Sequence, residues 1–120
     1  AYSGRGVAYA NTLQWDKAIN DFSSAIKINP NDIEAYFNLG NAYGNLKQWE
    51  KAIESFSSVI AINPNMTNAY YTRGVAYASN GQWDKAIADY SKALDLDPTF
   101  ETAFIQREIA KKNLNAGNHP

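Results

Sequence analysis

The residues with the greatest capacity for chemistry are two arginine–aspartate pairs with one spacing. Arg5 precedes Asp21 by sixteen residues, and Arg73 precedes Asp89 by the same number. A planar guanidinium binds a carboxylate through two parallel hydrogen bonds, so such pairs can form a charged binding spot or tie two helices together. We favour the structural role and predict that each arginine lies within salt-bridge reach of an aspartate on another helix.

Residue types that support catalysis or metal binding are scarce. His119 is the only histidine and stands in a Gly-Asn-His-Pro end, and cysteine is absent. The glycines of residues 3–6 lack the third member of a dinucleotide-binding loop, and Asn65-Met66-Thr67 is a frequent chance match to a glycosylation acceptor. The 12 acidic residues are scattered. We therefore expect no enzyme activity, no cofactor and no metal.

Composition narrows the possible partners. The 120 residues are 45% hydrophobic, enough for a packed core, and carry a net charge of −1. No basic stripe indicates nucleic acid, and no apolar run reaches the roughly 20 residues of a membrane span. The sequence opens at Ala1 inside a repeat, which suggests a fragment or a processed piece. The sequence does not determine the cellular compartment, and we take the cytoplasm as a working assumption.

The elements that must position these residues are repeats. The phrase Gln-Trp-Asp/Glu-Lys-Ala-Ile occurs three times, with its tryptophans 34 residues apart. A fixed period of this length indicates stacked supersecondary units rather than one globular core. The positions that share the step are Trp15, Trp49 and Trp83; Gly6, Gly40 and Gly74; Tyr9, Tyr43 and Tyr77; Ala18, Ala52 and Ala86; and Pro30, Pro64 and Pro98.

Each copy contains two apolar stripes with helical spacing, separated by a short break. In the middle copy Asn31 is the predicted N-cap, with Glu34 completing a capping box. Gly40 and Ala52 are small, so we expect the two helices to approach closely there. The predicted helices span 2–13, 16–28, 32–46, 49–62, 66–80, 83–96 and 100–115, and no strand is expected.

The sequence resembles the tetratricopeptide repeat family. The middle copy matches the family pattern at Tyr36, Leu39, Gly40, Tyr43, Ala52, Phe56 and Pro64, and the other copies match it similarly. The resemblance implies an all-α fold, a right-handed α-solenoid of three helix-turn-helix hairpins. We expect repeats at 1–32, 33–66 and 67–100, a capping helix at 101–116 and a tail at 117–120.

The last helix departs from the repeat pattern, because Glu108 stands at the glycine position and Lys111 at the tyrosine position. No further helix is expected to pack tightly on these polar residues. The apolar stripe Ala103, Ile109, Ala110 and Leu114 is predicted to cover the last hairpin, with Lys111 and Lys112 toward solvent. A polar outer face is what a terminal repeat needs for solubility.

Comparison of the copies supports the structural role of the ion pairs. Copies one and three share Arg-Gly-Val-Ala-Tyr-Ala, whereas copy two has Leu39 at the arginine position and Ser55 at the aspartate position. Arginine and aspartate are thus present or absent together. The tryptophans could form an aromatic ladder for bases or sugars, but we prefer packing across each hairpin turn.

Tetratricopeptide arrays usually bind extended peptides or helices in a concave groove lined by the first helix of each repeat. The resemblance therefore implies a roomy groove rich in neutral amides. The family's carboxylate clamp is not expected, because only Asn38 matches it among Ser3, Val7, Asn38, Asn68 and Thr72. The expected groove residues are Val7, Asn11, Glu34, Phe37, Asn38, Asn41, Asn45, Asn68, Tyr71, Thr72, Val75 and Ile105.

Three functions follow as hypotheses. The first is a non-catalytic module that binds a protein or peptide partner in this groove, where the asparagines of the middle copy would dominate. The second is a structural segment of a longer solenoid that self-associates through its first face, with Tyr2, Tyr9 and Leu13. The third is a regulatory segment of a larger enzyme. Nucleic-acid and membrane partners are not expected.

Overall fold

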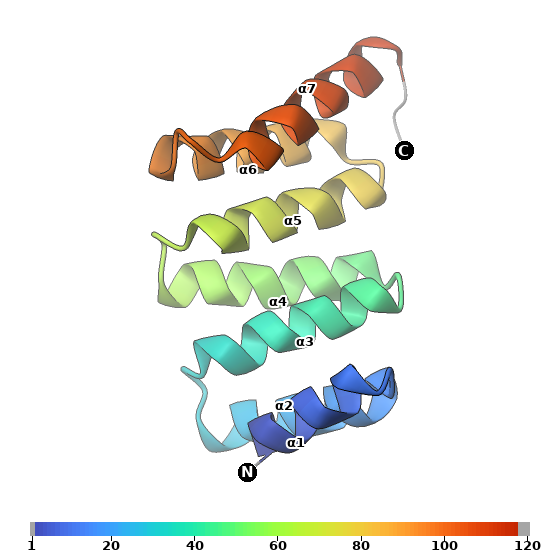
Figure 1. Ribbon diagram of the computed structural model, residues 1–120, viewed down its shortest axis with the longest axis vertical. Coiled ribbons are helices and arrows are strands. Elements are labelled where there is room, and N and C mark those ends of the chain that lie inside the picture. Colours follow the sequence, from blue (N-terminus) through green and yellow to red (C-terminus); the bar gives the residue numbers. More distant parts are fainter. Residues whose placement is uncertain (1, 118–120) are drawn as a thin grey trace. The chain divides into compact units, whose positions relative to one another are not determined.

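The computed structural model describes the backbone of residues 2–117 and the side chains of residues 4–117, and within this range it contains seven helices and no strand (Figure 1). The predicted helix boundaries agree with these helices to within two residues, so the all-α prediction is confirmed. Two compact units divide the chain, Ala1–Asn63 and Pro64–Pro120. The helices are α1 Tyr2–Asn11, α2 Trp15–Ile28, α3 Ile33–Asn45, α4 Trp49–Ile62, α5 Thr67–Ser79, α6 Trp83–Leu96 and α7 Glu101–Asn115.

Helices pair as antiparallel hairpins inside each unit. In the first unit α1 packs on α2 and α3 on α4, and α2 also contacts α3. In the second unit α6 packs between α5 and α7. The first core contains Ala18, Phe22 and Leu39, and the second contains Ala86, Tyr90 and Ala110.

An aromatic ring over a glycine closes each hairpin. A Cβ atom added to Gly6, Gly40 or Gly74 would lie 2.6–2.7 Å from a ring carbon of the second helix, which is far inside van der Waals contact. The rings belong to Phe22, Phe56 and Tyr90. The prediction that small residues allow close helix approach is therefore confirmed, with an aromatic ring rather than Ala52 opposite Gly40.

The turn inside each hairpin uses a left-handed residue. Leu13 and Lys47 both have φ 59°, and Gly81 has φ 77° at the equivalent position. The next residue donates its backbone N–H five residues back, as in Gln48 N to Tyr43 O at 2.9 Å. This is the Schellman pattern, for which glycine is the preferred residue. Only the third hairpin has a glycine, Gly81, at this position.

The predicted N-cap of α3 was wrong by one residue. Asp32, not Asn31, caps the helix, because its Oδ1 accepts the N–H of Ala35 at 3.0 Å. The N–H of Asn31 donates instead to Oδ1 of Asn29 at 3.2 Å, which places Asn31 in the loop turn. Glu34 lies in the first turn of the helix and forms no reciprocal capping box around Asn31.

The outer face of α7 is less polar than predicted. Ala103 and Ala110 are buried, Leu114 is half-buried, and Lys111 and Lys112 are exposed, as expected. Ile109, however, is 45% exposed, and Phe104 and Ile105 are 49% and 47% exposed. Ile109 precedes Ala110 directly and so lies about 100° away from the packed face. None of the described helices is long and apolar enough to cross a membrane.

Candidate functional site

Both arginine–aspartate pairs form inside single hairpins. In each pair Nε and Nη2 of the arginine donate to the two carboxylate oxygens at 2.7 Å, joining Arg5 to Asp21 and Arg73 to Asp89. Both carboxylates are buried. The pairing prediction is therefore confirmed, and the pairs join the first helix of a hairpin to the second.

The electrostatics of the pairs suit a structural tie rather than proton transfer. The hydrogen bonds from Arg5 lower the pKa of Asp21, and the hydrogen bonds to Asp89 raise the pKa of Arg73. Both shifts favour the charged forms, so these groups do not exchange protons near neutral pH. In the second hairpin Leu39 is buried at the arginine position, and the buried Ser55 hydroxyl donates to its own helix, to Lys51 O at 3.1 Å.

The tryptophans differ in their surroundings. Trp49 packs across its hairpin turn, since its Cζ3 lies 3.6 Å from the Cβ position of Gly44. Trp83 packs against the core of the second unit. The prediction of packing across the hairpin turn is confirmed for Trp49. For Trp83 the structure shows packing on the core, and Trp15 lines a surface hollow of the first unit.

That hollow is the best candidate binding site of the first unit. It has a volume of about 220 Å³ and lies between α1 and α3, with α2 below. Five of its residues were expected in a groove, and they combine one apolar side chain with four amides. The lining residues are Val7, Ala10, Asn11, Trp15, Phe22, Asn38, Asn41 and Asn45.

The asparagines of α3 are not equivalent. The side chain of Asn45 donates to the carbonyl of Asn41, one turn earlier, at 2.8 Å, so its amide is already bonded to its own helix. Asn45 therefore has a structural hydrogen bond in addition to its predicted place in the groove. Asn38 is half-buried and Asn41 exposed, and their side-chain amides form no hydrogen bond with other described residues. They are the amides that a ligand can use.

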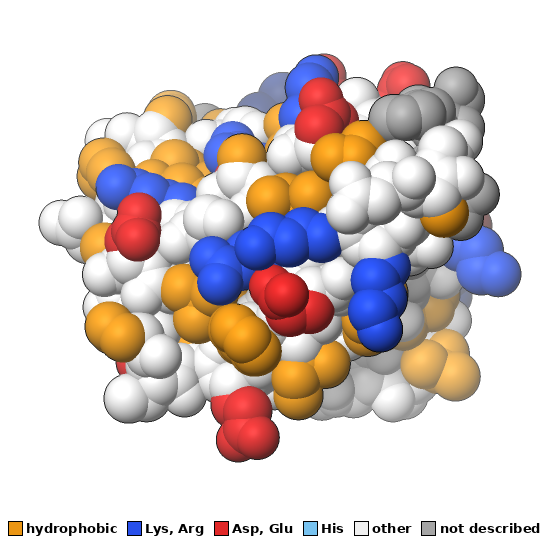
Figure 2. Space-filling model, turned by 90° about the horizontal axis from the view of Figure 1, so that it is seen from above, with side chains coloured by type: hydrophobic (Ala, Val, Ile, Leu, Met, Phe, Trp, Pro, Cys, Tyr) orange, Lys and Arg blue, Asp and Glu red, His pale blue; other side chains and the backbone are white. Residues whose placement is uncertain are grey.

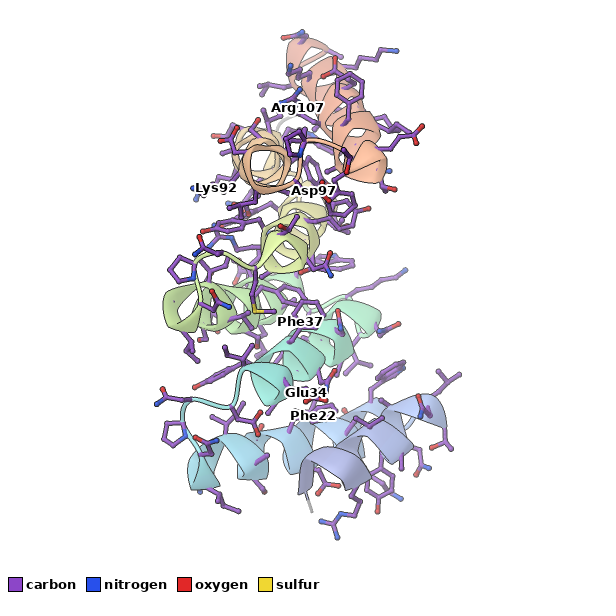
Figure 3. All side chains as sticks on the ribbon, turned by 60° about the vertical axis from the view of Figure 1, so that its left-hand side comes forward. Phe22, Glu34, Phe37, Lys92, Asp97 and Arg107 are labelled. Atoms are coloured by element: carbon purple, nitrogen blue, oxygen red, sulfur yellow. The ribbon has the colours of Figure 1, made fainter. Side chains whose placement is uncertain are left out.

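Two expected groove residues of α3 lie outside the hollow. The Phe37 ring packs edge-on against Phe56, with ring centroids 5.5 Å apart, and so belongs to the core of its hairpin. Glu34 is exposed in the first turn of α3. Figure 3 labels both side chains, together with Phe22 of α2.

In the second unit most of the expected residues are engaged in packing. Tyr71 lies between Phe100 and Tyr90, with centroid distances of 4.9 and 5.8 Å, and burial raises its pKa. The Thr72 hydroxyl donates to two carbonyls of its own helix. Val75 packs against the core, and Ile105 is exposed on α7. Tyr71 therefore packs on the core of the second unit and is not a free groove residue.

Asn68 lines a separate hollow of about 470 Å³ in the second unit, with Met66, Thr67, Asp97 and Phe100. Asp97, labelled in Figure 3, uses its Oδ1 within its own loop, where this oxygen accepts the Thr99 hydroxyl at 2.6 Å. Among the described residues, no three His, Cys, Asp or Glu side chains could hold a metal ion together. His119 lies outside the described residues, as does the side chain of Ser3.

Three residues near the candidate sites were not predicted from the sequence. Trp15 and Phe22 line the first hollow, although Trp15 was predicted to pack across its hairpin turn and Phe22 was not among the expected groove residues. Arg107 was not predicted, because only the glycine and tyrosine positions of the last helix, and not its arginine position, were compared with the repeats. It stands 34 residues after Arg73 and therefore holds the arginine position of the repeat. The same 34-residue step would have found it.

Models of known protein families match most of the chain. A tetratricopeptide repeat model matches residues 33–66 and 67–100, and a second, described as a TPR repeat, matches residues 14–47. The chain belongs to the tetratricopeptide repeat family. None of the curated proteins matches the sequence significantly.

Solved tetratricopeptide structures show the same fold. The Arabidopsis OM64 TPR domain is 29% identical, with a TM-score of 0.87 over 93% of each chain. MamA from Desulfovibrio magneticus RS-1 is also 29% identical, with a TM-score of 0.87 over 98% of this chain and 66% of that chain. The first TPR of Spaghetti (RPAP3), bound to an HSP90 peptide, has a TM-score of 0.90 at 24% identity over 95% of this chain and 90% of that one. These likenesses confirm the solenoid class that the repeats predicted.

Proposed function

We propose that this tetratricopeptide chain is a non-catalytic protein-interaction module that binds an extended, largely neutral peptide in the hollow of the first unit. The observation that carries the proposal is the lining of that hollow, in which the amides of Asn38 and Asn41 lie beside Val7, Ala10 and Trp15. A primary amide both donates and accepts hydrogen bonds, so it can pair with a peptide group without reading charge.

The volume of the hollow limits what enters it. About 220 Å³ accommodates one or two side chains of a peptide rather than a folded domain. Burial of an apolar side chain against the Trp15 ring contributes about 1.5–3 kcal/mol, while the amides fix the peptide backbone. We therefore propose a peptide with a small or medium apolar residue at this point.

The charge of the lining separates this site from an acidic-peptide clamp. No Lys or Arg is among the residues that line the hollow. The first TPR of Spaghetti (RPAP3) binds the HSP90 peptide SRMEEVD, but its likeness to this chain supports the fold alone. We expect the peptide affinity of this chain to change little with salt, because few charges are screened.

Selection from a displayed random peptide library tests the proposal. Asn38→Ala combined with Asn41→Ala should weaken capture of the selected peptides about tenfold, which corresponds to one or two lost hydrogen bonds. Asn20→Ala, an exposed asparagine of α2, is the matched control and should leave capture unchanged. Capture that survives the double substitution with an intact fold would place the site elsewhere. Tyr71→Ala should lower the melting temperature but have little effect on peptide capture, because its ring packs in the second unit.

A second candidate is self-association through the first unit. Leu13 and Ile28 are each 72% exposed, which is high for aliphatic side chains of this size. We propose them as contacts between copies, while Tyr9 packs partly inside the unit. Sedimentation velocity across concentration tests this idea. A monomer at all concentrations, or a dimer unaffected by Leu13→Asn and Ile28→Lys, would exclude stacking through these residues.

A further inference from the structure

The exposed face of α7 carries the repeat positions with which α5 contacts α6. In the second unit Arg73 binds Asp89, and the ring of Tyr90 lies over Gly74. A step of 34 residues carries Arg73 to Arg107 and Gly74 to Glu108. It also carries Tyr70 and Tyr71 to Phe104 and Ile105, which are about half exposed.

Arg107 is held in position but incompletely bonded. Its Nε is buried and forms no hydrogen bond with any described residue. The carboxylate beside Nε belongs to Glu108 on the same helix, at 3.6 Å, and Nη1 reaches the Ser91 hydroxyl of α6 at 3.4 Å. Arg107 lies on α7 near α6 in Figure 3, and its guanidinium stacks over the Phe104 ring at 5.6 Å. A buried N–H group without a hydrogen bond lowers the stability of the folded chain. A carboxylate of a partner that accepts this hydrogen bond would remove that cost and so favour binding.

We propose that the exposed face of α7 docks an acidic amphipathic helix of a partner protein, whose aspartate binds Arg107 as Asp89 binds Arg73. Phe104 and Ile105 supply apolar contacts equivalent to those of Tyr70 and Tyr71. Glu108 pairs with Lys111 at 3.3 Å, so its carboxylate has a place at the rim when the incoming aspartate takes the guanidinium. Figure 2 looks onto the α7 end of the molecule, where apolar side chains lie among charged ones.

Glu108, which led us to expect no tightly packed further helix, restricts the sequence of the partner helix in this proposal. A Cβ atom at Gly74 would come within 2.7 Å of the Tyr90 ring, and Glu108 carries a whole side chain at the equivalent position. An aromatic residue directly after the aspartate therefore cannot fit. The partner helix needs a small residue there, such as alanine, glycine or serine.

The helix α6 provides the probe. A synthetic peptide of residues 82–97 with Tyr90→Ala contains the aspartate followed by a small residue, and its binding to the full chain is measured by fluorescence anisotropy. Arg107→Leu in the chain, or Asp89→Ser in the peptide, should each weaken binding about tenfold or more. The peptide that keeps Tyr90 should also bind at least tenfold more weakly. Glu108→Gly in the chain should restore binding of that unmodified peptide.

The same binding measurements have outcomes that would overturn the proposal. Binding that Arg107→Leu leaves unchanged would mean that the peptide replaces α6 in its own hairpin, and would overturn the proposal. Equal binding of the two peptides to the natural chain, or no binding at millimolar concentration, would overturn it as well. A dimer of the chain that Arg107→Leu abolishes would assign the face to a second copy instead. Circular dichroism checks that each variant keeps its helices.

Discussion

Arg73 binds Asp89 through both arms of its guanidinium, with Nε and Nη2 each 2.7 Å from a carboxylate oxygen. The arginine side chain is 20% exposed and that of the aspartate 6%, so the pair is largely shielded from water. Removing one partner of a shielded pair leaves the other charge unbalanced, whereas removing both partners need not.

We therefore predict that Arg73→Leu alone lowers the free energy of unfolding by about 3 kcal/mol. Combined with Asp89→Ser, which reproduces the Leu39 and Ser55 of the second copy, the loss should be about 1 kcal/mol or less. Urea unfolding of the single and double variants measures the coupling. Single losses that simply add would show that the pair contributes nothing as a pair. The equivalent Arg5→Leu should cost less, since Arg5 is 58% exposed.

Gly74→Ala should destabilise the chain by about 1–3 kcal/mol, because the added methyl group would overlap the Tyr90 ring. Gly4→Ala is the matched control. Nothing lies within 4 Å of its added Cβ, so alanine should stabilise α1 by about 0.5–1 kcal/mol. Melting temperatures that move in the same direction for both variants would contradict the close approach at Gly74.

Lys47→Gly should stabilise the chain by about 0.5–1 kcal/mol, since Lys47 has φ 59° and a side chain disfavours that conformation. Gly81→Ala, at the equivalent turn of the third hairpin, should destabilise it by a similar amount. Chemical denaturation of both variants checks the pair. A destabilising Lys47→Gly would show that the lysine side chain matters more than the backbone strain.

Tyr90→Phe should make the chain more resistant to alkali. Tyr90 is 1% exposed, and burial raises its pKa above the ordinary 10.0. The folded state therefore holds the phenolic proton more tightly than the unfolded state, so stability present below pH 10 is lost as the pH rises above it. The other two hairpins have phenylalanine at this position, as Phe22 and Phe56. Tyr90→Phe should therefore change the free energy of unfolding little at neutral pH and remove part of its loss in alkali. Identical unfolding profiles between pH 9 and 12 would rule out Tyr90 as the titrating group.

The helices could be predicted from sequence because each copy repeats one apolar period and ends at an asparagine or aspartate before proline. The Arg73–Asp89 tie was predictable for a related reason, since its residues are present or absent together across copies. The N-cap of α3 could not be predicted, because Asn31 and Asp32 are both good N-cap residues. Only the hydrogen bond from Asn31 N–H to Asn29, which holds Asn31 in the loop, decides between them.

The candidate site was predictable only in outline. A repeat assigns residues to the groove face of a helix, but aromatic rings on that face can turn to partners that are distant in sequence. Phe37 packs on Phe56, and Tyr71 packs on Phe100. Trp15 lines the hollow, whereas Trp49, at the same repeat position, packs on Gly44. Side-chain choices of this kind depend on tertiary neighbours that a single sequence does not give.

The aromatic–glycine contact and the arginine–aspartate tie both close within one hairpin, between positions sixteen residues apart. A duplication with its breakpoints in the loops around Pro30 and Pro64 would therefore deliver a unit that already holds all of its internal partners. Such a copy needs no compensating change in its neighbours before it can close. The array can thus gain or lose hairpins in single genetic steps, and the polar tie can then be replaced, as at Leu39 and Ser55, one hairpin at a time.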